Sequence, residues 1–171
     1  ITARCRGWAT PESVPENYLL WDFWQRRLVR SQLETIELTL RARSCHLFSL
    51  RPMLGRPQLL GTDGHFSQGA VETSDVVWRS DKGELCGNVR GNGGDPSTLF
   101  FHVPEKMQLS SATLHGTQVN VRHPEPHVLA VDIPALAQPA RLLLHFSGDP
   151  VKVGLRPYVP GRAATRSERW E

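Results

Sequence analysis

The sequence predicts an all-β protein, an antiparallel β-sandwich that forms a single domain. The first observation is that apolar and polar residues alternate in many short segments, as half-buried strands require. The second is that 13 Pro and 14 Gly are spread through the 171 residues, where they end short strands and interrupt long helices. Strands at a spacing of about 8–12 residues, with turn signals between them, favour a sandwich over alternating strands and helices.

The expected strands begin with an ambiguous segment at 18–31. Leu20, Trp24 and Leu28 lie four residues apart, which suits one face of a helix. The aromatic residues of the segment favour a pleated surface, and we therefore predict a strand. The turn at 80–83 ends in a glycine, which readily adopts positive φ, so we expect a hairpin there. The other strands are expected at 35–40, 45–50, 71–78, 84–89, 99–103, 108–114, 118–122, 128–133 and 141–146.

The sandwich domain is expected to span residues 18–159. Residues 1–17 form a lead-in in this prediction, with an edge strand at 1–10, and residues 160–171 form a disordered tail. The chain opens on Ile1 without a basic segment followed by an apolar stretch. We therefore expect a mature product or a piece cut from a longer polypeptide.

The charge pattern argues against a nucleic-acid-binding protein. The chain has 20 Lys and Arg against 17 Asp and Glu, a net charge of +3, and its arginines are scattered among acidic residues. No apolar run approaches the ~20 residues of a membrane span, so the sequence predicts no membrane partner. The cysteines Cys5, Cys45 and Cys86 cannot all pair and form no Cys-x-x-Cys motif. This argues against a disulfide-framed module and leaves a single bridge open.

Motifs that would mark an enzyme or a metal site are missing. His123 and His127 have the spacing of a helical zinc site, but the two prolines between them exclude the helix. Cys45 and His46 are adjacent, and in a strand they would point to opposite faces, so they form no nucleophile–base pair. Ser67 lacks the glycine two residues earlier that a nucleophile elbow needs. We therefore assign no catalytic residue, no metal ligand and no cofactor.

Four residues are candidates for contact with a ligand because of their chemistry. Trp21, Trp24 and Trp78 are expected in strands. An exposed indole ring would stack on the apolar face of a sugar, whereas burial in the core is the commoner fate of an aromatic residue. Asp22 lies between two aromatic residues, Trp21 and Phe23. Its alternative role is pairing within the sheet.

One segment resembles a known family. Residues 56–69, with the sequence RPQLLGTDGHFSQG, are similar to a stretch in the C-terminal domain of bacterial α-galactosidase-like (melibiase-like) glycoside hydrolases. Other segments that share the family's order lie at 21–24, 44–52 and 76–87. The resemblance covers about residues 18–148. It departs from the family at Gly64, where the family often has a basic residue.

This resemblance implies a β-sandwich that packs against a catalytic (β/α)8 barrel carrying the nucleophile and the acid/base. A barrel takes about 250 residues, so this chain is too short to contain one. The resemblance therefore implies a non-catalytic accessory domain whose partner is the barrel of the same polypeptide. In the motif, His65 and Gln68 are candidates for an interface or saccharide contact, or for bonds to the backbone that hold the loop.

The alternative function is an autonomous carbohydrate-binding module that presents Trp21, Trp24 or Trp78 to an oligosaccharide. A free-standing enzyme assembled from the strand histidines is a third hypothesis. The exposure of the tryptophans separates the first two. Coplanar exposed rings on one sheet face favour the binding module, and buried rings beside an exposed apolar patch favour a domain interface.

Overall fold

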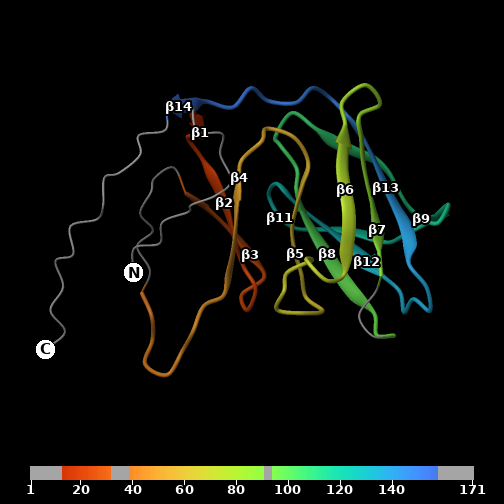
Figure 1. Cartoon of the computed structure of the whole chain (residues 1–171), viewed down its shortest axis with the longest axis horizontal. Coiled ribbons are helices and arrows are strands. Elements are labelled where there is room, and N and C mark those ends of the chain that lie inside the picture. Colours follow the sequence, from red (N-terminus) through yellow and green to blue (C-terminus); the bar gives the residue numbers. More distant parts are fainter. Residues whose placement is uncertain (1–12, 32–38, 91–93, 158–171) are drawn as a thin grey trace, which may run out of the picture.

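The computed structural model describes residues 13–31, 39–90 and 94–157, and every regular element within them is a β-strand (Figure 1). The strands form three antiparallel sheets and a separate two-stranded ribbon. The predicted all-β, sandwich-like fold is therefore confirmed.

The sheets are named here by their number of strands. The three-stranded sheet contains β3 (Arg27–Ser31), β2 (Tyr18–Asp22) and β4 (Phe48–Pro52), in that order. The four-stranded sheet contains β11 (Val121–Glu125), β12 (Val128–Ile133), β8 (Ser97–His102) and β5 (Gln58–Thr62). The five-stranded sheet contains β10 (Thr117–Gln118), β9 (Gln108–Leu114), β13 (Ala140–Ser147), β7 (Glu84–Val89) and β6 (Thr73–Arg79). The ribbon pairs β1 (Ser13–Pro15) with β14 (Leu155–Pro157).

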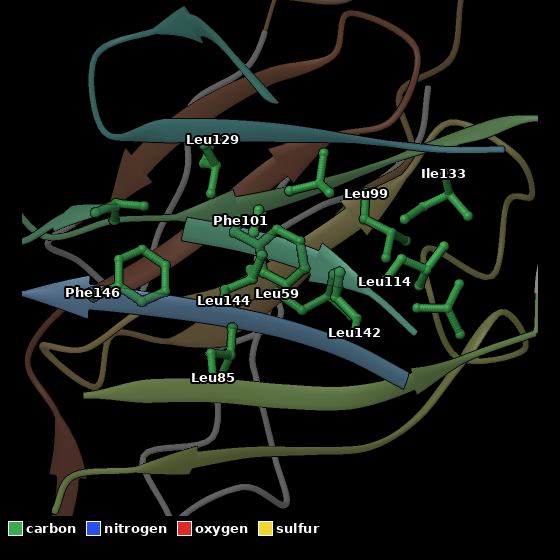
Figure 2. Close-up of a cluster of buried hydrophobic side chains, with 14 of the residues drawn as sticks. Leu59, Leu85, Leu99, Phe101, Leu114, Leu129, Ile133, Leu142, Leu144 and Phe146 are labelled. Carbon is green, nitrogen blue, oxygen red and sulfur yellow. The ribbon is translucent and has the colours of Figure 1, made fainter. Parts of the chain in front are cut away.

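One face of the four-stranded sheet packs on the five-stranded sheet. Leu99 and Phe101 of β8 meet Leu142 and Leu144 of β13 in a purely apolar layer (Figure 2). We call this layer the large core. Its other buried residues are Leu59, Leu85, Val89, Val103, Met107, Ala112, Leu114, Leu129, Val131, Ile133, Ala140 and Phe146.

The opposite face of the four-stranded sheet packs on the three-stranded sheet, in a layer that we call the small core. Phe100 of β8 packs with Leu19 and Trp21 of β2, and the Trp21 and Phe100 rings lie 4.6 Å apart. The other buried residues of the small core are Leu60, Val128 and Ala130. Successive residues of β8 therefore face opposite cores, as the two-residue period of a strand requires. This is why all of β8 is buried.

Several predicted strands are confirmed. Those at 84–89, 108–114 and 128–133 coincide with β7, β9 and β12. The hairpin between β6 and β7 has its glycine, Gly83, at φ 59°. The segment predicted as one strand at 18–31 is instead two strands, β2 and β3, joined by a turn at 23–26.

Other strand predictions differ from the structure. The strand expected at 45–50 begins only at Phe48. Cys45 and His46 therefore lie in a loop and are not neighbouring residues of a strand. The strand expected at 118–122 is split between β10 and β11. Residues 39–40 of the strand expected at 35–40 are not in a strand, and 32–38 lie outside the described residues. The expected edge strand at 1–10 and the expected tail at 160–171 also lie outside them.

Strand β5 is not expected from the sequence, because the glycines of the motif at 56–69 favour a loop. The register of β5 against β8 shifts between Leu59 and Gly61, which is a β-bulge at Leu60. Leu59 enters the large core and Leu60 enters the small core, as the two-residue period of a strand requires. The bulge leaves the Leu60 carbonyl oxygen to accept a hydrogen bond from Ser49 Oγ at 2.5 Å. The bulge thus joins β5 to the three-stranded sheet.

Candidate functional site

Most candidate residues from the sequence lie at or near one end of the sandwich, which we call the loop end. It consists of the turn 23–26, the segment 44–47 and the loop 63–72, and it lies on the lower side of Figure 1. The turn and the loop are joined by an ion pair, with Arg26 Nη1 at 3.7 Å from Asp63 Oδ2. The loop end therefore brings together segments that are about 40 residues apart in the chain.

Asp22 is the last residue of β2, and its side chain is buried at the loop end. Its Oδ1 accepts a hydrogen bond from the Gln25 backbone N–H at 3.0 Å, which closes the turn 23–26. Its Oδ2 lies 2.5 Å from Nδ1 of His46. Both carboxylate oxygens are thus paired, as burial of a charge requires.

His46 is a site residue that the sequence brought to notice only as a neighbour of Cys45. Its ring stacks on Phe48 with a centroid distance of 5.5 Å, and its Nδ1 donates to Asp22. The contact depends on the pairing of β2 with β4, which places Asp22 opposite Phe48. Only knowledge of this strand pairing would have identified His46, since the two residues lie 24 positions apart in the sequence.

The loop 63–72 begins with a carboxylate that fixes it to the four-stranded sheet. Asp63 Oδ1 accepts a hydrogen bond from the Thr98 backbone N–H at 2.6 Å, and the Asp63 N–H donates to the Thr98 carbonyl oxygen at 3.1 Å. Asp63 also pairs with Arg26. The start of the loop is therefore held from two sides.

His65 and Gln68 do not converge on a common external target. His65 Nδ1 accepts a hydrogen bond from the Ser67 backbone N–H at 3.1 Å, and the His65 carbonyl oxygen accepts one from the Gln68 N–H at 3.0 Å. Gln68 has its side chain buried and its backbone at φ 53°, and its carbonyl oxygen accepts a hydrogen bond from Arg51 at 3.4 Å. These bonds hold the shape of the loop.

A second buried carboxylate closes the loop 63–72. Ser67 Oγ donates to Oε2 of Glu72 at 3.0 Å, and the Glu72 side chain is 1% exposed. The Glu72 carbonyl oxygen accepts a hydrogen bond from the Arg90 N–H at 2.8 Å. The sequence argument did not identify Glu72, because a single glutamate after a glycine-rich segment carries no recognisable motif.

The three candidate tryptophans have different environments. Trp21 is fully buried in the small core. Trp24 lies in the turn 23–26 with 59% of its surface exposed. Trp78 lies on β6 and packs edge-on against Phe146, with 6.1 Å between the ring centroids. The three rings therefore form no shared flat platform.

The exposed surface of the loop end combines apolar rings with guanidinium groups. Trp24 is 59% exposed, and Phe66 of the loop 63–72 is 65% exposed. The Arg26–Asp63 ion pair links the turn that carries Trp24 to the loop that carries Phe66. Further exposed arginines lie close in sequence to these segments: Arg27 begins β3, and Arg41 and Arg43 precede the segment 44–47. These side chains suit a partner that offers both apolar surface and acceptors for arginine.

Arg51 of β4 reaches from the three-stranded sheet to the loop 63–72. Its guanidinium donates to the carbonyl oxygens of Leu60 and Gln68, both at 3.4 Å. Burial lowers the pKa of Arg51 from its ordinary value, because the charged form loses solvent. Among the described residues, no carboxylate lies within ion-pair distance of Arg51.

Within the described residues, no group of three or more His, Cys, Asp or Glu side chains is arranged to hold a metal ion. Cys45 is exposed, Cys86 is buried, and neither is in a disulfide, while Cys5 lies outside the described part of the chain. No helix in the same part of the chain is long and apolar enough to cross a membrane.

Fold and site together define a sandwich-like β-domain that presents an ordered, partly aromatic end. Compared with models of protein families, with curated proteins and with solved structures, the chain gives no match.

Proposed function

We propose that the chain is a non-catalytic accessory domain of an α-galactosidase-like glycoside hydrolase, and that it packs with its loop end against the catalytic barrel of the same polypeptide. The observation that carries this proposal is that the residues resembling the family build this end. The loop 63–72 belongs to the motif at 56–69, and the turn 23–26 overlaps the aromatic segment at 21–24.

The rigidity of the loop end supports an interface role. Asp22 holds the turn and the segment before β4, and Asp63 and Glu72 hold the two ends of the loop 63–72. Exposed apolar side chains on such a fixed backbone lose little conformational entropy when a partner covers them. Trp24 and Phe66 have this character. They would form the apolar centre of the contact, with the arginines at its rim.

The buried carboxylates of the loop end also fit a structural role. Asp22 and Glu72 are both nearly inaccessible to solvent, and each binds groups of its own chain. A glycoside hydrolase instead places two carboxyl groups on either side of a bound sugar. In the proposal, the barrel supplies that pair and this domain shapes and stabilises it.

The carbohydrate-binding module stays as the second candidate because of one observation. Trp24 and Phe66 are both exposed at the loop end, and the ion pair Arg26–Asp63 joins their segments. Exposed aromatic rings on segments that also carry charged groups are suited to a saccharide. Trp21 and Trp78 do not contribute to this surface, which leaves a smaller stacking area than three tryptophans would give.

The first test reads the coding sequence on both sides of the chain. The proposal requires an in-frame (β/α)8 barrel of about 250 residues. A complete reading frame without such a barrel would contradict it.

The second test expresses that barrel with and without this domain and measures aryl α-galactoside hydrolysis. The barrel should lose thermal stability without the domain, and the domain alone should show no turnover. In the joined protein, Trp24→Ala and Phe66→Ala should lower the barrel's melting temperature. The control Val77→Ala alters an exposed apolar residue of β6 and should leave it unchanged.

Titration of the isolated domain with oligosaccharides, followed by tryptophan fluorescence, separates the two candidates. The accessory domain should give no saturable shift at millimolar sugar. A saturable shift that Trp24→Ala abolishes, together with a barrel that is equally stable alone, would establish the binding module instead.

A further inference from the structure

Three polar side-chain atoms near the loop end are buried and have no hydrogen-bond partner among the described residues. They are Nε1 of Trp21, Oε1 of Gln68 and Oε1 of Glu72. The three side chains are 0%, 4% and 1% exposed. Because an unpaired buried polar group is costly, such atoms commonly bind an interior water molecule.

Two of these atoms converge on Gly61 in β5. A Cβ atom at Gly61 would lie 3.3 Å from Trp21 Nε1 and 3.2 Å from Gln68 Oε1. One atom belongs to a hydrogen-bond donor and the other is an acceptor. A single water molecule complements both, because it accepts with its oxygen and donates with its hydrogens.

The backbone of the loop 63–72 is strained at Gln68, whose side chain is buried. Gln68 has a φ of 53°, in the left-handed region that side-chain-bearing residues rarely adopt, and Gly69 follows at φ 96°. The Gln68 carbonyl oxygen is held by Arg51. Strained residues of this kind persist where their surroundings fix them.

We propose that the junction of β2, β5 and the loop 63–72 contains a binding site for one water molecule. The water accepts a hydrogen bond from the Trp21 indole N–H and donates one to Gln68 Oε1. Gly61 is the third component, because any side chain there would contact both atoms. The motif residues Gly61 and Gln68 thus acquire a shared role, which connects the loop 63–72 to the small core. This inference does not depend on the proposed function.

The test uses the whole chain with 15N-labelled indole groups. In nuclear Overhauser spectra, the Trp21 Hε1 proton should show a cross-peak to a long-lived water, whereas the exposed Trp24 Hε1 should exchange rapidly with bulk solvent. Gln68→Met removes the acceptor and preserves side-chain length, so it should abolish the Trp21 cross-peak. The control Gln118→Met changes an exposed glutamine of β10 and should preserve it.

A high-resolution crystal structure of the unaltered chain provides a readout that does not depend on any variant folding. The proposal expects an ordered water within about 2.7–3.2 Å of both atoms. A direct hydrogen bond between Nε1 and Oε1 with no intervening water would overturn it. So would a Trp21 cross-peak that persists unchanged in Gln68→Met.

Discussion

The large core and the small core lie on opposite faces of the same sheet, yet they are built differently. The buried residues of the large core are all apolar and come from two facing sheets. The small core ends in a polar boundary of Asp22, Gln68 and Glu72, which are all buried. Hydrogen bonds from His46 and Ser67 hold the Asp22 and Glu72 carboxylates. The non-directional hydrophobic effect therefore accounts for the stability of the large core. The small core also needs correctly placed hydrogen-bond partners at its boundary.

This difference indicates which parts of the molecule tolerate substitution and which parts depend on particular hydrogen-bond partners. An apolar core tolerates substitutions that preserve volume. A buried polar network fails when one partner is lost, because the remaining group is left unsatisfied. We expect mutations in the two regions to differ in size and in their dependence on particular partners.

The largest effect is expected in the large core. Leu144 of β13 is completely buried. Leu144→Ala removes apolar contacts and leaves a cavity, so the free energy of unfolding should fall by about 2–5 kcal/mol. Urea denaturation measures the loss. The exposed Val151→Ala should change it by less than about 0.5 kcal/mol, and an equal loss in both variants would contradict the assigned core.

The next largest effect is expected at Asp22. Asp22→Ala leaves the Gln25 N–H and the His46 imidazole without their partner and should cost about 2–3 kcal/mol. A double-mutant cycle with His46→Ala should give a coupling free energy above about 0.5 kcal/mol. Strictly additive effects would show that the two side chains do not depend on each other.

A smaller effect is expected where the loop 63–72 closes. Ser67→Ala removes one hydrogen bond to Glu72, and Glu72 keeps its position in the backbone network. The free energy of unfolding should fall by about 1 kcal/mol. Hydrogen exchange should quicken in the loop 63–72 and stay unchanged in β13. Uniform quickening across both regions would contradict the local role.

The smallest effect is expected at an exposed ion pair outside both cores. The hydrogen bond from Arg122 is the main cause that holds the pKa of Asp132 below its ordinary value of 3.8. Since the folded pKa is the lower one, the stabilisation is present above about pH 4 and is lost as the pH falls through the lowered pKa. Arg122→Gln should flatten the melting temperature profile between about pH 5 and 2. A profile unchanged by the substitution would exclude this linkage.

Sequence periodicity predicted the large core better than the small one, for a physical reason. Strands such as β7, β9 and β12 lie between clear turn signals, so they could be placed without knowing their partners. Strand β5 could not, because Gly61 lies within it and further glycines follow at 64 and 69, so its sequence resembled a loop.

The candidate site was only partly predictable for the same reason. Asp22, Trp24 and His65 stood out by their neighbours or by the motif that contains them. His46 and Glu72 did not, because their roles depend on contacts with Asp22 and Ser67 that sheet pairing and loop closure create. Residue chemistry is visible in a sequence, whereas the convergence of distant segments is set by tertiary structure.

The ribbon of β1 and β14 has a mechanical consequence. Ser13 lies opposite Pro157, so the chain enters and leaves the described fold at adjacent points. A force that separates the flanking segments would act across this ladder and break its hydrogen bonds one after another. Pulling would therefore release the ribbon at low force while both cores stay intact. The ribbon would yield first and protect the sandwich from tension in the polypeptide on either side.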